Sequence, residues 1–292
     1  EQRLALTERG RDADTLLMSA TPIPRTLMMT AYGDLDVSRL LEKPPGRRPI
    51  DTRTVPLDRF DEVTGGIARA LGRRAKIFWI CPVVEESEVT DLAAAEERYQ
   101  ALAALLPGRV GLVHGRMKSA EKDRAMASFA DGPIDLLVAT TVIEVGIDVP
   151  AATIMVVEHA ERFGLAQLHQ LRGRIGRGDQ PSTCILLYQP TLGEVARQRL
   201  AILRETEDGF RIAEEDLRLR GAGEVLGTRQ SGLPTLRLAD LAEHEELVAL
   251  AHDDARLILD RDPGLASPRG AALRLLLYLF QRDEAVQYLR AG

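Results

Sequence analysis

This sequence of 292 residues is poor in cysteine and in unbroken hydrophobic runs, and each shortage excludes a class of protein. Its two cysteines, Cys81 and Cys184, lie in apolar, strand-like segments. We therefore predict two buried thiols rather than a disulfide framework or a Cys/His metal site. The longest apolar stretches, such as Leu273–Phe280, are interrupted by charge and too short to span a bilayer. A globular, cytoplasmic protein without a membrane segment is expected.

The sequence also lacks an excess of positive charge and has few aromatic residues. Its 38 Lys and Arg against 44 Asp and Glu give a net charge of −6. Any contact with nucleic acid must therefore come from a local basic surface. Aromatic residues make up 4% of the chain, which argues against binding by stacked single-stranded bases. The sequence opens on Glu1 without a signal peptide or methionine, so we expect a piece of a longer protein.

Between residues 50 and 190, short β-branched segments alternate with amphipathic segments of about ten or more residues. The predicted strands are Thr52–Val55, Lys76–Cys81, Val110–Val113, Asp135–Ala139, Ile154–Glu158 and Thr183–Tyr188. The predicted helices are Asp58–Leu71, Asp91–Leu106, Ser119–Phe129 and Leu165–Arg174. This alternation is typical of βαβ units, so the predicted fold class is α/β with a parallel sheet.

Beyond Gln189 the strand pattern stops and only helices are predicted. A helical hairpin is expected from Gly193–Glu205 and Phe210–Arg220, followed by a glycine-rich loop over Gly221–Gly232. Two further helices are expected near Leu238–Asp260 and Pro268–Leu289.

The most informative segment, residues 170–177, reads QLRGRIGR and sets three arginines around two glycines. If the segment is helical, Arg174 and Arg177 are three residues apart and project to the same side. Each guanidinium offers five fixed donors, so the pair suits the oxygens of a triphosphate. Taken alone, the segment fits a solvated basic face at the end of a helix better than it fits a phosphate site.

The segment does not stand alone, because five segments in order resemble motifs of superfamily 2 helicases. They are Ser19–Thr21 (motif III), Val113–Met117 (a nucleic-acid-facing segment), Ala139–Pro150 (motif V), Gln170–Arg177 (motif VI) and Asp216–Gly232 (the translocation motif of the RecG family). The segments Asp34–Ser38, Leu41–Arg47 and Gly227–Gln230 resemble the RecG family more than the related transcription-repair coupling factor. The resemblance implies a RecA-like helicase C-terminal domain followed by a helical hairpin and a helical tail.

The resemblance also implies four regions. They are a remnant of the first RecA-like domain with its linker (1–49), the second RecA-like domain (50–190), the translocation motif (191–235) and a C-terminal helical region (236–292). The implied protein is an ATP-dependent helicase, monomeric as a whole, that uses Mg²⁺ and remodels branched DNA such as stalled forks and Holliday junctions. No G-x-x-x-x-G-K-[ST] loop and no Asp-Glu-x-His or Asp-Glu-x-Gln box occurs in the sequence. The fragment alone is therefore expected to be inactive, with the metal ligands lying outside it.

On the nucleotide side, the resemblance assigns Arg177 and Arg174 to the γ-phosphate and Gln170 to orienting them. It assigns Asp148 to the ribose and Gly146 to close backbone approach. Asp148 also fits a plain turn-forming carboxylate before Pro150.

On the DNA side, Thr140 is expected to contact a phosphate through its hydroxyl and backbone N–H, with Arg116 and Gln230 as further DNA contacts. His114 is an equally good candidate for a locally satisfied imidazole. The coupling residues are Ser19, Thr21, Arg199 and Arg220. We expect the hairpin arginines to bond carboxylates such as Glu214 or Asp216, an arrangement that a static ion-pair network would share.

Three alternatives follow from the same residues. The first is a DNA translocase of the coupling-factor type. The second is a noncatalytic module whose tail, Leu238–Leu289, binds a protein partner. The third, a nucleotide-binding oxidoreductase, fails because no G-x-G-x-x-G follows the first strand.

Overall fold

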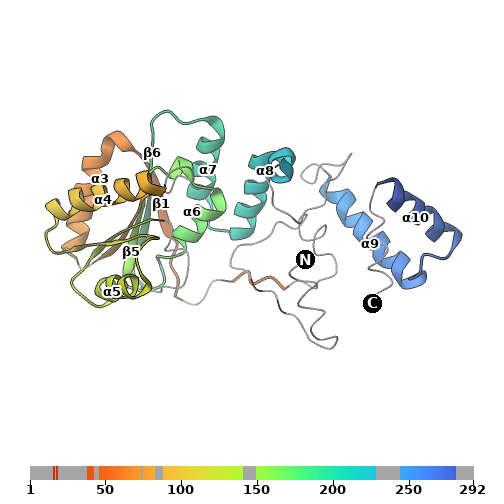
Figure 1. Ribbon diagram of the computed structural model, residues 1–292, viewed down its shortest axis with the longest axis horizontal. Helices are drawn as coiled ribbons and strands as arrows, with labels where there is room; N and C mark the ends of the chain where they lie inside the picture. The colour runs from red at the N-terminus through yellow and green to blue at the C-terminus, as the bar shows by residue number, and fades with distance from the viewer. Residues whose placement is uncertain are drawn as a thin grey trace. The chain divides into compact units, whose positions relative to one another are not determined.

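The computed structural model describes residues 16, 18, 38–42, 46–73, 75–82, 88–140, 149–227 and 244–280. Segment Glu42–Asp216 lies in one compact unit, and the chain from Leu217 onward belongs to a second. The first unit contains a six-stranded sheet with helices around it, and the second contains helices (Figure 1).

The sheet is parallel throughout and has the order β1-β6-β5-β2-β4-β3. Its strands are β1 (Ile50–Pro56), β2 (Lys76–Ile80), β3 (Val110–Val113), β4 (Leu136–Ala139), β5 (Ala152–Val157) and β6 (Ser182–Tyr188). All four residues of β4, Leu-Leu-Val-Ala, are buried, as expected of a strand covered on both faces. The α/β fold with a parallel sheet is confirmed, and the carboxyl ends of all strands meet at one edge.

The helices of the first unit lie between these strands or, for α7 and α8, after the last of them. They are α3 (Phe60–Leu71), α4 (Glu88–Leu105), α5 (Ser119–Ala130), α6 (Leu165–Arg172), α7 (Glu194–Glu205) and α8 (Gly209–Gly227), which continues into the second unit. Single 3₁₀ turns, η1 (Leu57–Arg59) and η3 (Ala160–Arg162), precede α3 and α6. Two helices, α7 and α8, therefore follow the last strand, as predicted.

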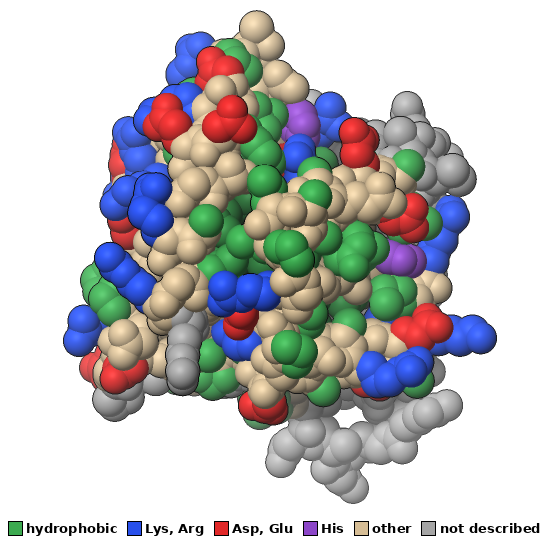
Figure 2. Space-filling view, turned by 90° about the vertical axis from the view of Figure 1, so that its left-hand side faces the viewer, with side chains coloured by type: hydrophobic (Ala, Val, Ile, Leu, Met, Phe, Trp, Pro, Cys, Tyr) green, Lys and Arg blue, Asp and Glu red, His purple; other side chains and the backbone are tan. Residues whose placement is uncertain are grey.

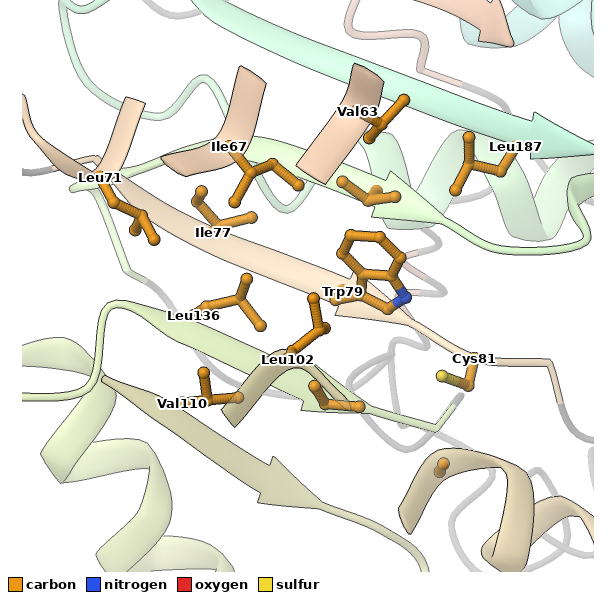
Figure 3. Close-up of a cluster of buried hydrophobic side chains, with 13 residues drawn as sticks. Val63, Ile67, Leu71, Ile77, Trp79, Cys81, Leu102, Val110, Leu136 and Leu187 are labelled. Carbon is orange, nitrogen blue, oxygen red and sulfur yellow. The ribbon is translucent and has the colours of Figure 1, made fainter. Parts of the chain in front are cut away.

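The main core lies between the sheet and the helices α3 and α4. Val63, Ile67 and Leu71 of α3 point onto the sheet and belong to one buried cluster with Ile77 and Trp79 (Figure 3). Trp79 is fully buried. On the opposite face Phe78 packs against Phe129 of α5, with ring centroids 4.8 Å apart. Helices on both faces bury the strands, and this leaves the carboxyl edge of the sheet for function.

The second unit contains α9 (Glu245–Arg261) and α10 (Pro268–Leu279). Asp262 accepts hydrogen bonds from the Ala266 and Ser267 N–H groups at 2.8 and 3.0 Å, and Ser267 caps α10 by accepting from Gly270 N at 3.0 Å. Several large apolar side chains of both helices are exposed: Leu247, Leu250, Leu257, Leu275, Leu276, Tyr278 and Leu279. In the part of the chain that the structure covers, no helix is both long and apolar enough to cross a membrane.

Several predicted boundaries are wrong, among them the end of α10, which lies at Leu279 rather than Leu289. Helix α6 ends at Arg172 rather than Arg174, because Gly173 closes it. Helix α8 runs on to Gly227, through the first part of the predicted glycine-rich loop, where Ala, Glu and Leu between the glycines favour a helix. In the tail, α9 begins at Glu245, and the remainder of that predicted helix up to residue 243 lies outside the described residues.

Candidate nucleotide and nucleic-acid site

The predicted DNA-facing residues Thr140, His114 and Arg116 meet at the carboxyl edge of the sheet. Strands β3 and β4 are neighbours, with Val113 opposite Ala139, so the residues that follow them are adjacent. The Thr140 N–H donates to Val113 O at 3.2 Å, and the Thr140 side chain is buried. The prediction that this N–H contacts a phosphate is therefore wrong, because β3 already uses it. The hydroxyl contact stays a prediction.

In the turn after β3, the side chain of Arg116 is exposed and that of His114 is half-buried. Met117 N donates to His114 O at 3.2 Å, and Lys122 from α5 donates to Gly115 O at 2.9 Å. These bonds fix the turn and leave the Arg116 side chain exposed at its tip. In contrast, His114 Nδ1 is buried and has no hydrogen-bond partner in the described part of the chain. The interpretation of His114 as a locally satisfied imidazole is thus not supported for this atom.

The predicted phosphate-binding arginines lie in a turn, not on a helix. Gly173 follows the last residue of α6, and Gly176 has a left-handed φ of 68°. The Arg177 Nε donates to Gly173 O at 3.3 Å, which folds the turn back on itself. The expectation that Arg174 and Arg177 share a helical face is therefore wrong, since two glycines replace the helix by a compact turn.

This turn, residues 173–178, lies between two other segments of the chain. A Cβ on Gly176 would stand 3.0 Å from Cγ1 of Ile50, where β1 begins. A Cβ on Gly178 would stand 3.2 Å from Pro150 O, at the end of the motif V segment. Motif V and the arginine turn are thus in contact at Pro150. Both Arg174 and Arg177 are half-buried, as is Gln170 in the last turn of α6.

Several predicted site residues lie outside the described residues: Ser19, Thr21, Gly146, Asp148 and Gln230. The backbone of Arg220 belongs to α8, but its side chain is also outside them. Their assigned roles stay predictions.

Arg199 of α7 makes a different bond from the predicted one. Its Nη1 donates to Phe163 O at 3.3 Å, in the segment just before α6. Among the described residues, Arg199 hydrogen-bonds to this main-chain oxygen and not to the carboxylates of Glu214 or Asp216 in α8. Arg199 therefore joins the hairpin to the arginine-bearing helix rather than clamping the two helices of the hairpin together.

A buried ion pair that the sequence did not reveal stabilises the same edge of the sheet. Glu158 follows β5 and accepts from Trp79 Nε1 at 2.9 Å and from Arg98 Nε and Nη2 at 2.8 and 2.5 Å. The Arg98 guanidinium also stands 4.4 Å from the centre of the Phe60 ring. Trp79 is thus a core residue with a polar partner, not a base-stacking platform.

Arg172, the third arginine of the segment, was also missed. It is 2% exposed and donates to main-chain oxygens of α7 and of the residue after it. One signal was available in the sequence. Leu165, Leu168 and Arg172 fall at i, i+3 and i+7, so the arginine occupies the apolar face of α6.

Charge on the molecular surface is mixed. On the face drawn in Figure 2, Lys and Arg alternate with Asp and Glu around a patch of apolar side chains. This agrees with the net charge of −6 and shows no single-sign field on that face. Contacts to phosphate would have to be local, as at Arg116.

Comparisons with known proteins find two matching families. Residues 69–179 match the family described as helicase conserved C-terminal domain, and these include the turn after β3, Thr140 and the arginine turn. Residues 206–286 match the family described as ATP-dependent DNA helicase RecG, domain 3, C-terminal. Over nine tenths of its length the chain is therefore similar to ATP-dependent DNA helicase RecG.

The RecG relatives match nearly all of this chain but are much longer. The ATP-dependent DNA helicase RecG of Acidithiobacillus ferridurans is 54% identical over 264 residues, which are 90% of this chain and 39% of the relative. That of Escherichia coli strain K12 is 50% identical over 270 residues, again 90% of this chain and 39% of the relative. The chain thus spans about two fifths of the length of these RecG proteins.

A solved structure, "Structure of RecG bound to three-way DNA junction", is similar to this chain with a TM-score of 0.64 and 46% identity. The match covers 81% of this chain and 30% of that one. It agrees with the RecA-like helicase fold described above.

The RecG relatives are named ATP-dependent DNA helicases, which indicates that ATP is the nucleotide they use. In the ranges that the structure covers, no cluster of three or more His, Cys, Asp or Glu could hold a metal ion. The arginine turn does fit the phosphates, because it carries two half-buried guanidiniums on a backbone fixed by hydrogen bonds. The described residues therefore hold two guanidiniums in one turn and no cluster of metal ligands.

Proposed function

We propose that this chain is the C-terminal motor portion of an ATP-dependent DNA helicase that branch-migrates stalled replication forks and Holliday junctions in repair and recombination. The observation that carries the proposal is the match to RecG helicases over 90% of the chain at about half identity. In the proposal, residues 1–49 are the remnant and linker, 50–190 the second RecA-like domain, 191–235 the translocation motif and 236–292 the helical tail. The protein works in the cytoplasm as a monomer.

In this proposal the arginine turn serves an ATP held mainly by the preceding RecA-like domain. Arg177 and Arg174 donate to the γ-phosphate and stabilise the charge that develops during hydrolysis, which is worth roughly 10³–10⁵ in rate in a complete site. Gln170 orients them, and Asp148 and Gly146 receive the ribose. The Walker loop and the Mg²⁺ ligands come from the upstream part, since this sequence has neither motif.

In the same proposal the DNA track lies at the ends of β3 and β4. The exposed Arg116 contacts a phosphate directly. The Thr140 hydroxyl, which is buried, contacts a phosphate when it becomes exposed. Such contacts position DNA without reading its sequence, as a motor requires. Gln230 contacts DNA from the translocation motif, while Arg199 and Arg220 with Ser19 and Thr21 link hydrolysis to movement.

The test uses the full-length protein that carries this chain, with a synthetic fork and a Holliday junction. We expect ATP-dependent conversion of both substrates, and no ATP hydrolysis from residues 1–292 alone. Full-length protein that hydrolyses ATP without converting either substrate would contradict the proposal. So would DNA-stimulated hydrolysis by the isolated chain.

A second, noncatalytic role for the tail is favoured by its exposed apolar side chains on α9 and α10. In this role the tail binds a protein partner, or braces the motor, and takes no part in hydrolysis. Removing residues 233–292 from the full-length protein tests this. Retained fork conversion with loss of a bound protein supports docking, whereas loss of fork conversion supports bracing.

A further inference from the structure

Arg172 differs from the other arginines of the described residues, because its whole side chain is buried. It is the last residue of α6 and stands two positions before Arg174. A buried guanidinium is costly unless every donor finds an acceptor, so its partners reveal what it holds together.

The partners of Arg172 come mostly from the end of the hairpin helix α7. Its Nη1 donates to Leu203 O and, at 3.3 Å, to the Thr52 hydroxyl of β1. Its Nη2 donates to Thr206 O at 2.9 Å. Leu203 and Thr206 belong to the last turn of α7 and the residue after it, where carbonyls have no partner within a helix. The guanidinium therefore caps α7 from α6, where a cation also suits the helix dipole.

Two neighbours fix the geometry of this cap. Arg172 Nη2 lies 3.2 Å from His169 Nδ1, and because arginine can only donate, that nitrogen must be the unprotonated one. Burial lowers the pKa of Arg172, and the Glu207 carboxylate acts in the opposite direction. Glu207, one residue past Thr206, also accepts a hydrogen bond from Ile50 N.

These bonds join three segments that the proposed function treats separately. They are the first strand after the linker (Ile50 and Thr52), the helix that leads into the arginine turn (Arg172) and the connection between α7 and α8 (Thr206 and Glu207). Helices α6 and α7 lie side by side (Figure 1), and Arg199 of α7 also donates to Phe163 O, two residues before α6 begins.

We infer that Arg172 is a positioning residue that transmits displacement of the arginine turn to the helical hairpin. The inference rests on the proposed function. When Arg174 and Arg177 engage or release the phosphates, the backbone two residues away moves with them, and the guanidinium fork carries that movement to the end of α7. A lysine keeps the charge but has no fork, so it cannot hold both carbonyls in one geometry.

The test compares DNA conversion with ATP consumption in the full-length protein. For Arg172→Lys we expect DNA-stimulated ATP hydrolysis to stay within about threefold of the unaltered protein, while junctions converted per ATP fall about tenfold or more. The matched control is Arg98→Lys, which removes a similar fork from the Glu158 pair, away from the hairpin. It should leave the ratio unchanged.

A purely structural role predicts another result, in which hydrolysis and conversion fall together in Arg172→Lys and the ratio stays within twofold. That result would overturn the inference. If Arg172→Lys does not fold, Glu207→Gln replaces it, because it keeps the acceptor for Ile50 N and removes the charge beside Arg172. A two- to fivefold loss in the ratio is then expected, and an unchanged ratio again overturns the inference. Absence of DNA-stimulated hydrolysis in the unaltered protein would instead contradict the proposed function.

Discussion

Gly176 sets the backbone of the arginine turn. Its φ of 68° suits glycine, and a Cβ there would stand 3.0 Å from Ile50 Cγ1. We expect Gly176→Ala to lower the free energy of unfolding by about 1–3 kcal/mol, from the left-handed backbone and the tight contact together. Urea denaturation measures this. Gly65→Ala, inside α3 with its nearest neighbour at 3.7 Å, should instead stabilise by about 0.5–1 kcal/mol. Equal stability of Gly176→Ala and the unaltered chain would refute the account of the turn.

The Glu158–Arg98 pair is a second residue-scale feature with a measurable cost. The two side chains are 9% and 25% exposed. Glu158→Gln leaves the guanidinium without its countercharge, and we expect a loss of about 3 kcal/mol in the free energy of unfolding. Glu194→Gln is the control, because its pair with Arg197 is more than 60% exposed and should be worth under about 0.5 kcal/mol. Similar losses for the two variants would contradict the prediction.

The two cysteines give a prediction for pH. Burial raises the pKa of Cys81 and of Cys184 from 9.0 to about 12. At pH 8 neither should react with a thiol reagent in the folded chain, while both react in urea. Between pH 9 and 12 the unfolded chain loses these protons first, so stability should fall as the pH rises through that window. Rapid labelling of either cysteine in the folded chain at pH 8 would show that it is not buried.

At the scale of elements, Asp262 holds the connection between α9 and α10. Hydrogen bonds from the Ser267 hydroxyl and from the Ala266 and Ser267 N–H groups lower the pKa of Asp262 below its ordinary value of 3.8. The bonds are therefore fully present above about pH 4 and are lost as the pH falls through the lowered value. We expect the protection factors of the Ala266 and Ser267 amides, which compare their exchange rates with those of an unfolded chain at the same pH, to fall in acid. In Asp262→Asn the protection factors should already be lower at neutral pH, with little further change in acid; an unaltered pH profile of protection in that variant would contradict this.

Element boundaries were predictable where a pattern extended over many residues. The alternation of β-branched and amphipathic segments placed all six strands and both helices of the hairpin. The helical pattern gave the wrong end for α6, because Gly173 and Gly176 end the helix before Arg174 and Arg177. It also gave the wrong end for α8, because the helix-forming residues between the glycines extend the helix to Gly227.

The bonds around the arginine turn could not be read from spacing. The partners of Arg172 lie 31, 34 and 120 positions away along the chain, and Arg98 is 60 positions from Glu158. Only the fold brings such residues together. The arginine on the apolar face of α6 was a local sign of burial, but it did not show which oxygens would receive the guanidinium.

At the scale of the whole molecule, we propose that the arginine turn presents cations to a nucleotide, while the described residues include no cluster of metal ligands. Its RecG relatives are more than twice as long, since the 90% of the chain that matches covers 39% of them. In the proposed function this chain forms one side of an ATP site, with the arginine turn on this chain and the phosphate-binding loop on the preceding domain.

That claim is tested most directly by DNA-stimulated ATP hydrolysis in the full-length protein, measured with and without the substitution Arg177→Ala. The account predicts that Arg177→Ala lowers the rate at saturating ATP by about 10³-fold or more, while binding of fork DNA without nucleotide stays unchanged. A rate within about threefold of the unaltered protein, in a variant that is folded and binds DNA, would contradict it.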